Sequence, residues 1–201
     1  MASLAERQLE LLERMAAVEP APYIMGGFAE DALLAGHVTR PHEDVDWLLP
    51  RQELQLRLAQ AAELGFETFE TWGESAPGEP FYLYGENGDL KLDLGVADDV
   101  DGRLHVKIHK LFFEVEGGGE APAGYRFALP DDALAHPPVR LEGITLRVVS
   151  PLTLYQLRAG IASQGSFGPL SERHLAALAE LRERYFQQRS EDELLPIVES
   201  L

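Results

Sequence analysis

The sequence contains no cysteine, so disulfides, thiolate metal sites and a cysteine nucleophile are all excluded. It has no apolar run approaching the roughly 18 residues that would predict a membrane-spanning helix. The N-terminal stretch is amphipathic and of mixed charge, without the continuous apolar segment of a signal peptide. These absences predict a cytoplasmic protein with no membrane partner.

Basic residues are scarce, because 17 Lys and Arg stand against 34 Asp and Glu, for a formal net charge of −17. A surface of this charge repels phosphates, and no basic patch compensates for it, so we expect no nucleic-acid partner. The charge has two remaining interpretations. It can serve solubility alone, or it can mark an acidic cleft that attracts a cationic small molecule. In the second case a nucleotide would need Mg²⁺ to neutralise its phosphates.

Common catalytic motifs are missing as well. The sequence has neither a glycine-rich loop ending in Gly-Lys-Ser/Thr nor a Gly-x-Gly-x-x-Gly segment, which excludes the P-loop and Rossmann modes of nucleotide binding. The His-Glu-x-x-His and Gly-x-Ser-x-Gly motifs are also absent.

At 201 residues, of which 45% are hydrophobic, the chain fits one domain or a core with a small appended bundle. Its patterns predict a mixed α/β core over residues 1–149 and a helical C-terminal subdomain over residues 150–201. We expect a hairpin over 139–149 that turns at 142–143, a helix that begins at 150–151, and a loop over 116–124. The other predicted helices are 3–18, 28–35 and 51–64, and the predicted strands are 23–25, 44–49, 66–72, 81–84, 90–97 and 103–108.

Two aspartates, Asp44 and Asp46, begin a predicted strand. Side chains alternate along a strand, so both carboxylates point to one face while Val45 and Trp47 point to the other. Two adjacent carboxylates repel each other unless a cation lies between them. Mg²⁺ takes oxygen ligands and is usually held by one or two carboxylates together with substrate phosphates. A solvated Asp-x-Asp at a strand end is the alternative.

A third carboxylate is expected from a neighbouring strand, and Asp93 is the best candidate. Leucines flank it on both sides, which places it firmly within a strand. Its predicted role is general base toward an attacking hydroxyl, or ligand of a second metal ion. An ordinary exposed strand face is the alternative.

The glycine pair Gly26-Gly27 lies between a predicted strand and a predicted helix. Glycine permits positive φ and leaves room for a phosphate near backbone N–H groups, and the helix N-terminus adds a favourable dipole. A tight turn without a ligand is the alternative.

Several basic residues are candidates for phosphate binding. Arg40 and His42 precede the aspartates and can reach a triphosphate or steady the loop. Lys91 shares a strand face with Asp93 and can neutralise a phosphate or pair with that aspartate. Further candidates, with no motif to choose among them, are Lys107, Lys110, Arg158 and Arg173.

The segment from Gly26 to Asp46 resembles the nucleotidyltransferase superfamily, in particular the aminoglycoside and lincosamide adenylyltransferases of antibiotic resistance. The shared pattern is Gly-Gly, an aromatic residue, Ala, x, Asp, followed by Thr-Arg-x-His-x-Asp-x-Asp. The chain departs from the family at Phe28, where Trp is usual, and at Trp47, where a small aliphatic residue is usual. It also lacks a recognisable counterpart of the family's C-terminal Arg-Pro-Lys-Asp motif.

The resemblance implies an α/β (α+β) fold, with a short mixed sheet flanked by helices. It implies a Mg²⁺-dependent enzyme that transfers a nucleoside monophosphate from a nucleoside triphosphate, ATP being the first choice, to a hydroxyl of a small acceptor. Asp44 and Asp46 would take the metal-ligand positions, Asp93 the third carboxylate, and Gly26-Gly27 the phosphate-binding turn. Asp31 matches a position that we interpret as a structural brace. Two alternatives remain: nucleotidylation of a macromolecule, and a binding module without turnover.

Overall fold

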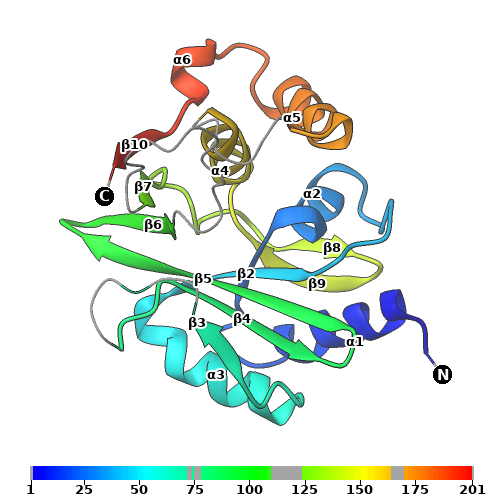
Figure 1. Cartoon of the computed structure of the whole chain (residues 1–201). Helices are drawn as coiled ribbons and strands as arrows, with labels where there is room; N and C mark the ends of the chain where they lie inside the picture. Colours follow the sequence, from blue (N-terminus) through cyan, green and yellow to red (C-terminus); the bar gives the residue numbers. More distant parts are fainter. Residues whose placement is uncertain (1, 72–73, 75–77, 110–123, 164–169, 201) are drawn as a thin grey trace.

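The computed structural model describes the whole chain except residues 1, 72–73, 75–77, 110–123, 164–169 and 201. Ten strands among the described residues form one mixed sheet, which lies between two groups of helices (Figure 1). One group consists of α1 (Leu4–Ala16) and α3 (Leu54–Glu63). The other consists of α2 (Gly26–Leu34), α4 (Pro151–Ser163) and α5 (Glu172–Tyr185). The predicted mixed sheet flanked by helices is therefore confirmed.

Strand β5 (Leu90–Val100) is the centre of the sheet. On one side it runs parallel to β2 (Val45–Pro50), and on the other it pairs antiparallel first with β4 (Tyr82–Asn87) and then with β6 (Arg103–His109). Beyond β6 follow β7 (Gly124–Ala128) and β10 (Ile197–Ser200). Beyond β2 follow β1 (Tyr23–Met25), β9 (Ile144–Val148) and β8 (Val139–Leu141), and β3 (Phe69–Thr71) pairs with β4.

The predicted turn at 142–143 and the predicted helix start at 150–151 are present in the structure. The hairpin between β5 and β6 turns at Asp101 and Gly102, and the hairpin between β8 and β9 turns at Glu142 and Gly143, all four with positive φ. Such φ values suit the right-handed twist of two-residue hairpins. Helix α4 begins after Ser150, whose Oγ accepts a hydrogen bond from the Thr153 backbone N–H at 3.2 Å.

The C-terminal region differs from the prediction of helices alone. After α5 and the short α6 (Glu191–Leu194), the chain forms strand β10, which pairs antiparallel with β7. Neither β7 nor β10 was predicted, because both are short and their pairing joins segments far apart in the sequence. The predicted loop over 116–124 lies outside the described residues up to 123, and Gly124 begins β7. The division at residue 149 stays a prediction.

The core fixes the strand face that carries the aspartates. Val45, Trp47 and Leu49 of β2 are fully buried on one face of that strand, as predicted. Leu92 and Leu94 of β5 are fully buried as well. Slipping either strand by one residue would expose these side chains, so burial locks the register that the site depends on. No helix among the described residues is long and apolar enough to span a bilayer.

Candidate active site

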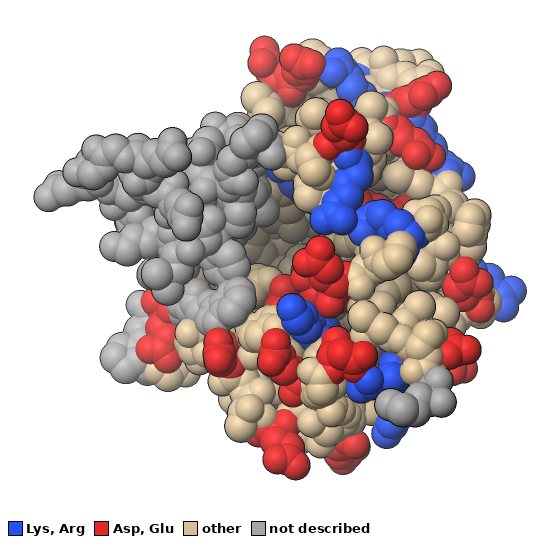
Figure 2. Space-filling model, turned by 45° about the vertical axis from the view of Figure 1, so that its right-hand side comes forward, with Lys and Arg blue, Asp and Glu red and all other residues tan. Residues whose placement is uncertain are grey.

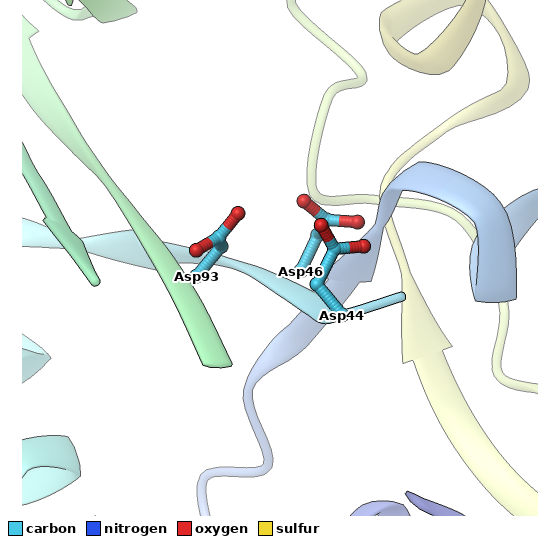
Figure 3. A group of neighbouring side chains, drawn as sticks. All are labelled: Asp44, Asp46 and Asp93. Carbon is cyan, nitrogen blue, oxygen red and sulfur yellow. The ribbon is translucent and has the colours of Figure 1, made fainter. Parts of the chain in front are cut away.

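Three carboxylates meet at one point on the sheet: Asp46 in β2, Asp93 in the parallel strand β5, and Asp44 directly before β2. In the pairing of β2 with β5, Asp46 lies opposite Asp93. Asp44 is two residues before Asp46, and alternation puts both on the same face. One oxygen of each of the three carboxylates lies within 4.8 Å of the others, and Figure 3 shows all three side chains rising from the same side of the sheet.

Asp93 is held in place by Tyr82 of β4. The Tyr82 hydroxyl donates a hydrogen bond of 2.8 Å to Oδ2 of Asp93. The other oxygen, Oδ1, is buried and accepts no hydrogen bond from any described residue. A buried carboxylate oxygen without a partner is costly unless a cation or a donor completes its coordination.

Burial and neighbouring negative charges raise the pKa values of all three carboxyl groups. Burial, with the nearby charge of Asp44, raises the pKa of Asp93 to about 6. Burial and the charges of Asp44 and Asp93 raise the pKa of Asp46 well above its usual value. Burial and the adjacent Glu43 raise the pKa of Asp44. The cluster is therefore a place where negative charge is disfavoured until a cation compensates it.

The donor set fits a hard divalent cation. Carboxylate oxygens are the ligands of Mg²⁺, Mn²⁺ and Ca²⁺, and the described part of the chain brings no His or Cys ligand to this cluster. The unpartnered Oδ1 of Asp93 and the raised pKa values favour the binding of a cation. Asp44, Asp46 and Asp93 are thus suited to hold one or two such ions.

The glycine pair forms the first turn of α2, rather than a separate turn before it. Gly26 has φ +65, and a Cβ there would lie 1.9 Å from Oδ2 of Asp46. A Cβ at Gly27 would lie 2.4 Å from Nδ1 of His42. Only glycine allows the helix N-terminus to approach the Asp46 carboxylate this closely.

His42 is buried between an acid and a base. Its Nε2 lies 2.7 Å from Oδ2 of Asp31, and its Nδ1 lies 3.1 Å from Nη1 of Arg40. Because arginine can only donate, Nδ1 is the acceptor and Nε2 carries the proton toward Asp31. Burial alone would raise the pKa of Asp31, but hydrogen bonds from His42 and Thr39 outweigh it and lower that pKa. Asp31 thus braces the loop before β2.

The other basic candidates fall into two groups. Arg40, Lys107, Arg158 and Arg173 line one cavity together with Gly26, Gly27, His42, Asp44 and Asp46. Within this group, Lys107 is also 3.6 Å from Asp98. Lys91 does not line the cavity, although its charge lowers the pKa of Asp93. Lys110 lies outside the described residues.

The cavity has a volume of about 510 Å³ and lies between the carboxylates and the helices α4 and α5. Figure 2 shows this face hollowed, with Lys and Arg side chains on one side of the hollow and Asp and Glu side chains on another. The lining combines these charges with an apolar wall, whose described members are Met25, Leu48, Val106, Leu154, Leu157 and Leu170.

Three lining or supporting residues could not be assigned to the site from the sequence. Tyr82 has only its place in a predicted strand as a signal, and Glu30 only its place beside Asp31. His174 lies in a segment without a recognisable motif. Burial and the positive charges of Arg158, Arg173 and Arg40 lower the pKa of His174 to about 4, so it is neutral at physiological pH.

Comparison with known proteins gives structural likeness without close sequence relatives. No protein-family model and no curated protein sequence matches the chain. A crystal structure of ANT(2″)-Ia in complex with adenylyl-2″-tobramycin matches with a TM-score of 0.63 at 19% identity, over 94% of this chain and 92% of that one. A solution structure of the antibiotic-resistance factor ANT(2″)-Ia matches with a TM-score of 0.57 at 21% identity, over 90% and 85%.

A third match is an antigenic nucleotidyltransferase-like protein from Paracoccidioides brasiliensis, with a TM-score of 0.41 at 16% identity over 90% of this chain and 77% of that one. ANT(2″)-Ia is an aminoglycoside nucleotidyltransferase. The two ANT(2″)-Ia structures cover most of this chain. The chain therefore has the nucleotidyltransferase fold that the motif from Gly26 to Asp46 predicted.

Proposed function

We propose that this protein is a Mg²⁺-dependent nucleotidyltransferase, which moves a nucleoside monophosphate from a nucleoside triphosphate to a hydroxyl of a small molecule. The observation that carries the proposal is the meeting of Asp44, Asp46 and Asp93 within 4.8 Å. Asp44 and Asp46 line a cavity together with arginines and with the first residues of α2, and this position supports the proposal. ATP is the first choice of nucleotide, because one structural neighbour was solved with an adenylylated product.

The carboxylates are the proposed metal ligands. Asp44 and Asp46 hold the ion that accompanies the triphosphate, and Asp93 completes the site or binds a second ion. When bound, the metal neutralises the phosphates and polarises the α-phosphate. The chain itself holds the three carboxylates in a fixed arrangement. The parallel pairing of β2 with β5 sets the spacing of Asp46 and Asp93, and Tyr82 fixes the orientation of Asp93.

The triphosphate is proposed to lie against the first turn of α2. Backbone N–H groups at a helix N-terminus point outward and favour anions, and the first two residues of this turn, Gly26 and Gly27, have no side chains. Arg40 supplies positive charge from the loop, and His42 steadies Arg40 through their 3.1 Å contact. Lys91 acts through its charge on Asp93, since it does not line the cavity.

Where Asp93 does not bind a metal ion, it is the proposed general base. The acceptor hydroxyl oxygen bonds to the α-phosphorus while the bond to the pyrophosphate leaving group breaks, and the hydroxyl proton passes to Asp93. Its Oδ1 has no hydrogen-bond donor among the described residues and is therefore available to take that proton.

The acceptor is proposed to be a small hydroxylated molecule, with cationic ones as first candidates. The net charge of −17 favours the approach of a cation. The structural neighbour that carries adenylyl-2″-tobramycin makes aminoglycosides the first acceptors to test, followed by lincosamides.

A labelled-triphosphate assay tests this proposal. Purified protein is mixed with Mg²⁺, ATP labelled in the α-phosphate, and a panel of aminoglycosides and lincosamides, and pyrophosphate release is followed. Parallel reactions with cell lysate are separated into protein, RNA and small-molecule fractions. The proposal expects label in small molecules. Label in protein or RNA would favour nucleotidylation of a macromolecule, and nucleotide binding without release across the panel would favour a binding module.

A further inference from the structure

Glu30 is a buried carboxylate that contacts two arginines from distant parts of the chain. Its Oε1 lies 2.5 Å from Nη2 of Arg158 in α4, and its Oε2 lies 3.4 Å from Nη2 of Arg40 in the loop before β2. The side chain of Glu30 is only 6% exposed, whereas both arginines line the cavity. The three residues together present net positive charge to the cavity, with their one negative charge buried outside its lining.

These contacts differ from those of an ion pair that serves only the fold. Oε1 of Glu30 is buried close to Arg158 but has no aligned hydrogen bond. By contrast, the buried Arg57 donates to Gln60 at 2.8 Å and to Glu53 at 3.0 Å. The attraction between opposite charges therefore holds Arg158 in place. Few of its five N–H donors bond to Glu30, so the others are left for a ligand.

The trio lies beside the carboxylate cluster. Arg158 and Glu30 are both close enough to Asp46 to act on its pKa, Arg158 lowering it and Glu30 raising it. Glu30 also belongs to the helix whose first turn is Gly26-Gly27. Phosphates held at that turn would have both guanidinium groups within the same cavity.

We propose that Glu30 is a positioning residue for nucleotide binding, which holds Arg40 and Arg158 at the cavity wall so that both meet the phosphates of a Mg²⁺–nucleoside triphosphate. The inference rests on the proposed function and deepens it. The proposal assigns α4 a role in triphosphate binding, because α4 carries Arg158. Glu30 in α2 contacts Arg158 and so connects the two helices.

The direction of the effect of Glu30→Gln separates positioning from simple electrostatics. Glu30→Gln removes a negative charge near the phosphates and makes the cavity more positive. If Glu30 acted only through its charge, it would repel the phosphates, and this substitution would tighten phosphate binding. A positioning residue gives the opposite result. Without Glu30 the two guanidinium groups repel each other and separate, so phosphates bind more weakly.

The test measures binding rather than turnover. Titration calorimetry gives the Kd of two probes in the presence of Mg²⁺: α,β-methylene-ATP, which cannot be cleaved, and inorganic tripolyphosphate, which has no base or sugar. The proteins are the wild type, Glu30→Gln, Arg158→Gln, the double variant, and Glu53→Gln. The last makes the same chemical change in a carboxylate that pairs with a buried arginine in α3 and does not line the cavity. Thermal unfolding shows that each variant is folded.

We expect Glu30→Gln to weaken the binding of both probes about 10-fold, which is the usual loss when a residue that orients the ligands of a metal site is replaced. In the Arg158→Gln background its effect is smaller, and Glu53→Gln binds as the wild type does. Unchanged or tighter binding by Glu30→Gln would overturn the inference, as would equal weakening by Glu53→Gln. If the wild type bound neither probe, the proposed function itself would fail, which is a different result from a Glu30 variant that binds normally.

Discussion

Two buried clusters of charge in this molecule are built in opposite ways. In α3, Arg57 is fully buried and donates to two acceptors, Oε1 of Gln60 at 2.8 Å and Oε2 of Glu53 at 3.0 Å, while its Nε has no hydrogen-bond partner among the described residues. Gln60 in turn donates to the backbone oxygen of Met15, which joins α3 to α1. At the sheet, by contrast, Asp44, Asp46 and Asp93 bring three like charges within 4.8 Å.

The difference supports the proposal that the first cluster serves the fold and the second serves a ligand. A buried charge with hydrogen-bonded partners is compatible with folding, whereas like charges close together oppose it. The carboxylate cluster therefore lowers stability unless a cation binds, and such a cost is typical of functional sites. Breaking the first cluster should reduce stability, and breaking the second should reduce activity.

The largest expected effect is that of Asp44→Asn on transfer. Losing a proposed metal ligand misplaces the triphosphate, and misplacement by about 1 Å alone costs on the order of 10²-fold in rate. We expect at least that loss in kcat with an unchanged fold, measured by pyrophosphate release and circular dichroism. Normal turnover by this variant would contradict the metal assignment.

The next largest expected effect is the loss of transfer activity in Gly26→Ala. The new methyl group would meet Oδ2 of Asp46, so we expect a loss of activity of about 10²-fold, measured by the same assay. The matched control is Gly102→Ala, because Gly102 also has positive φ but a Cβ there meets nothing within 4 Å. That variant should show the same backbone strain, about 1–2 kcal/mol per residue, and keep its activity. Equal activity in both variants would show that the contact with Asp46 is unimportant.

Stability should change in opposite directions in the two clusters. Asp46→Asn removes a charge that burial disfavours and that Asp44 and Asp93 repel, so at pH 8 without metal it should raise the free energy of unfolding. Glu53→Gln should lower it at pH 8 by about 1–3 kcal/mol, because Arg57 loses a partner. Denaturant unfolding at pH 8 measures both.

The pH dependence of this gain follows from the sign of the pKa shift. The pKa of Asp46 is raised in the fold, so the part of the stability that depends on this group is fully present below the unfolded value of 3.8 and is lost as pH rises through the folded pKa. The advantage of Asp46→Asn should therefore vanish near pH 4. An advantage of equal size at pH 4 and pH 8 would rule out charge repulsion as its cause.

A smaller effect on thermal stability is expected from the addition of Mg²⁺ without nucleotide. The metal needs ionised carboxylates, and the pKa of Asp93 is raised to about 6, so Mg²⁺ should stabilise the protein more at pH 8 than at pH 5. At ten times its Kd the gain should be roughly 3–5 °C in Tm at pH 8. Asp46→Asn should lose this gain, and Glu53→Gln should keep it. Equal gains at both pH values would point to nonspecific binding.

The sequence predicts the strand face that carries the three aspartates better than its surroundings. Alternation places Asp44 and Asp46 on one face, and the flanking leucines place Asp93 within a strand, so local patterns suffice for these residues. Glu30 and Arg158 are far apart in the sequence, so no periodic pattern predicts that they pair. Strand β10 is likewise defined by its pairing with β7 and not by its own four residues.

The central claim is that Asp44, Asp46 and Asp93 together bind the metal that accompanies a nucleotide. A crystal of the wild-type protein grown with Mn²⁺ and α,β-methylene-ATP tests it most directly, because Mn²⁺ is located by its anomalous scattering. We expect a peak within bonding distance of all three carboxylates, with the phosphates against the first turn of α2. A fully occupied nucleotide whose metal touches none of the three aspartates would contradict the account.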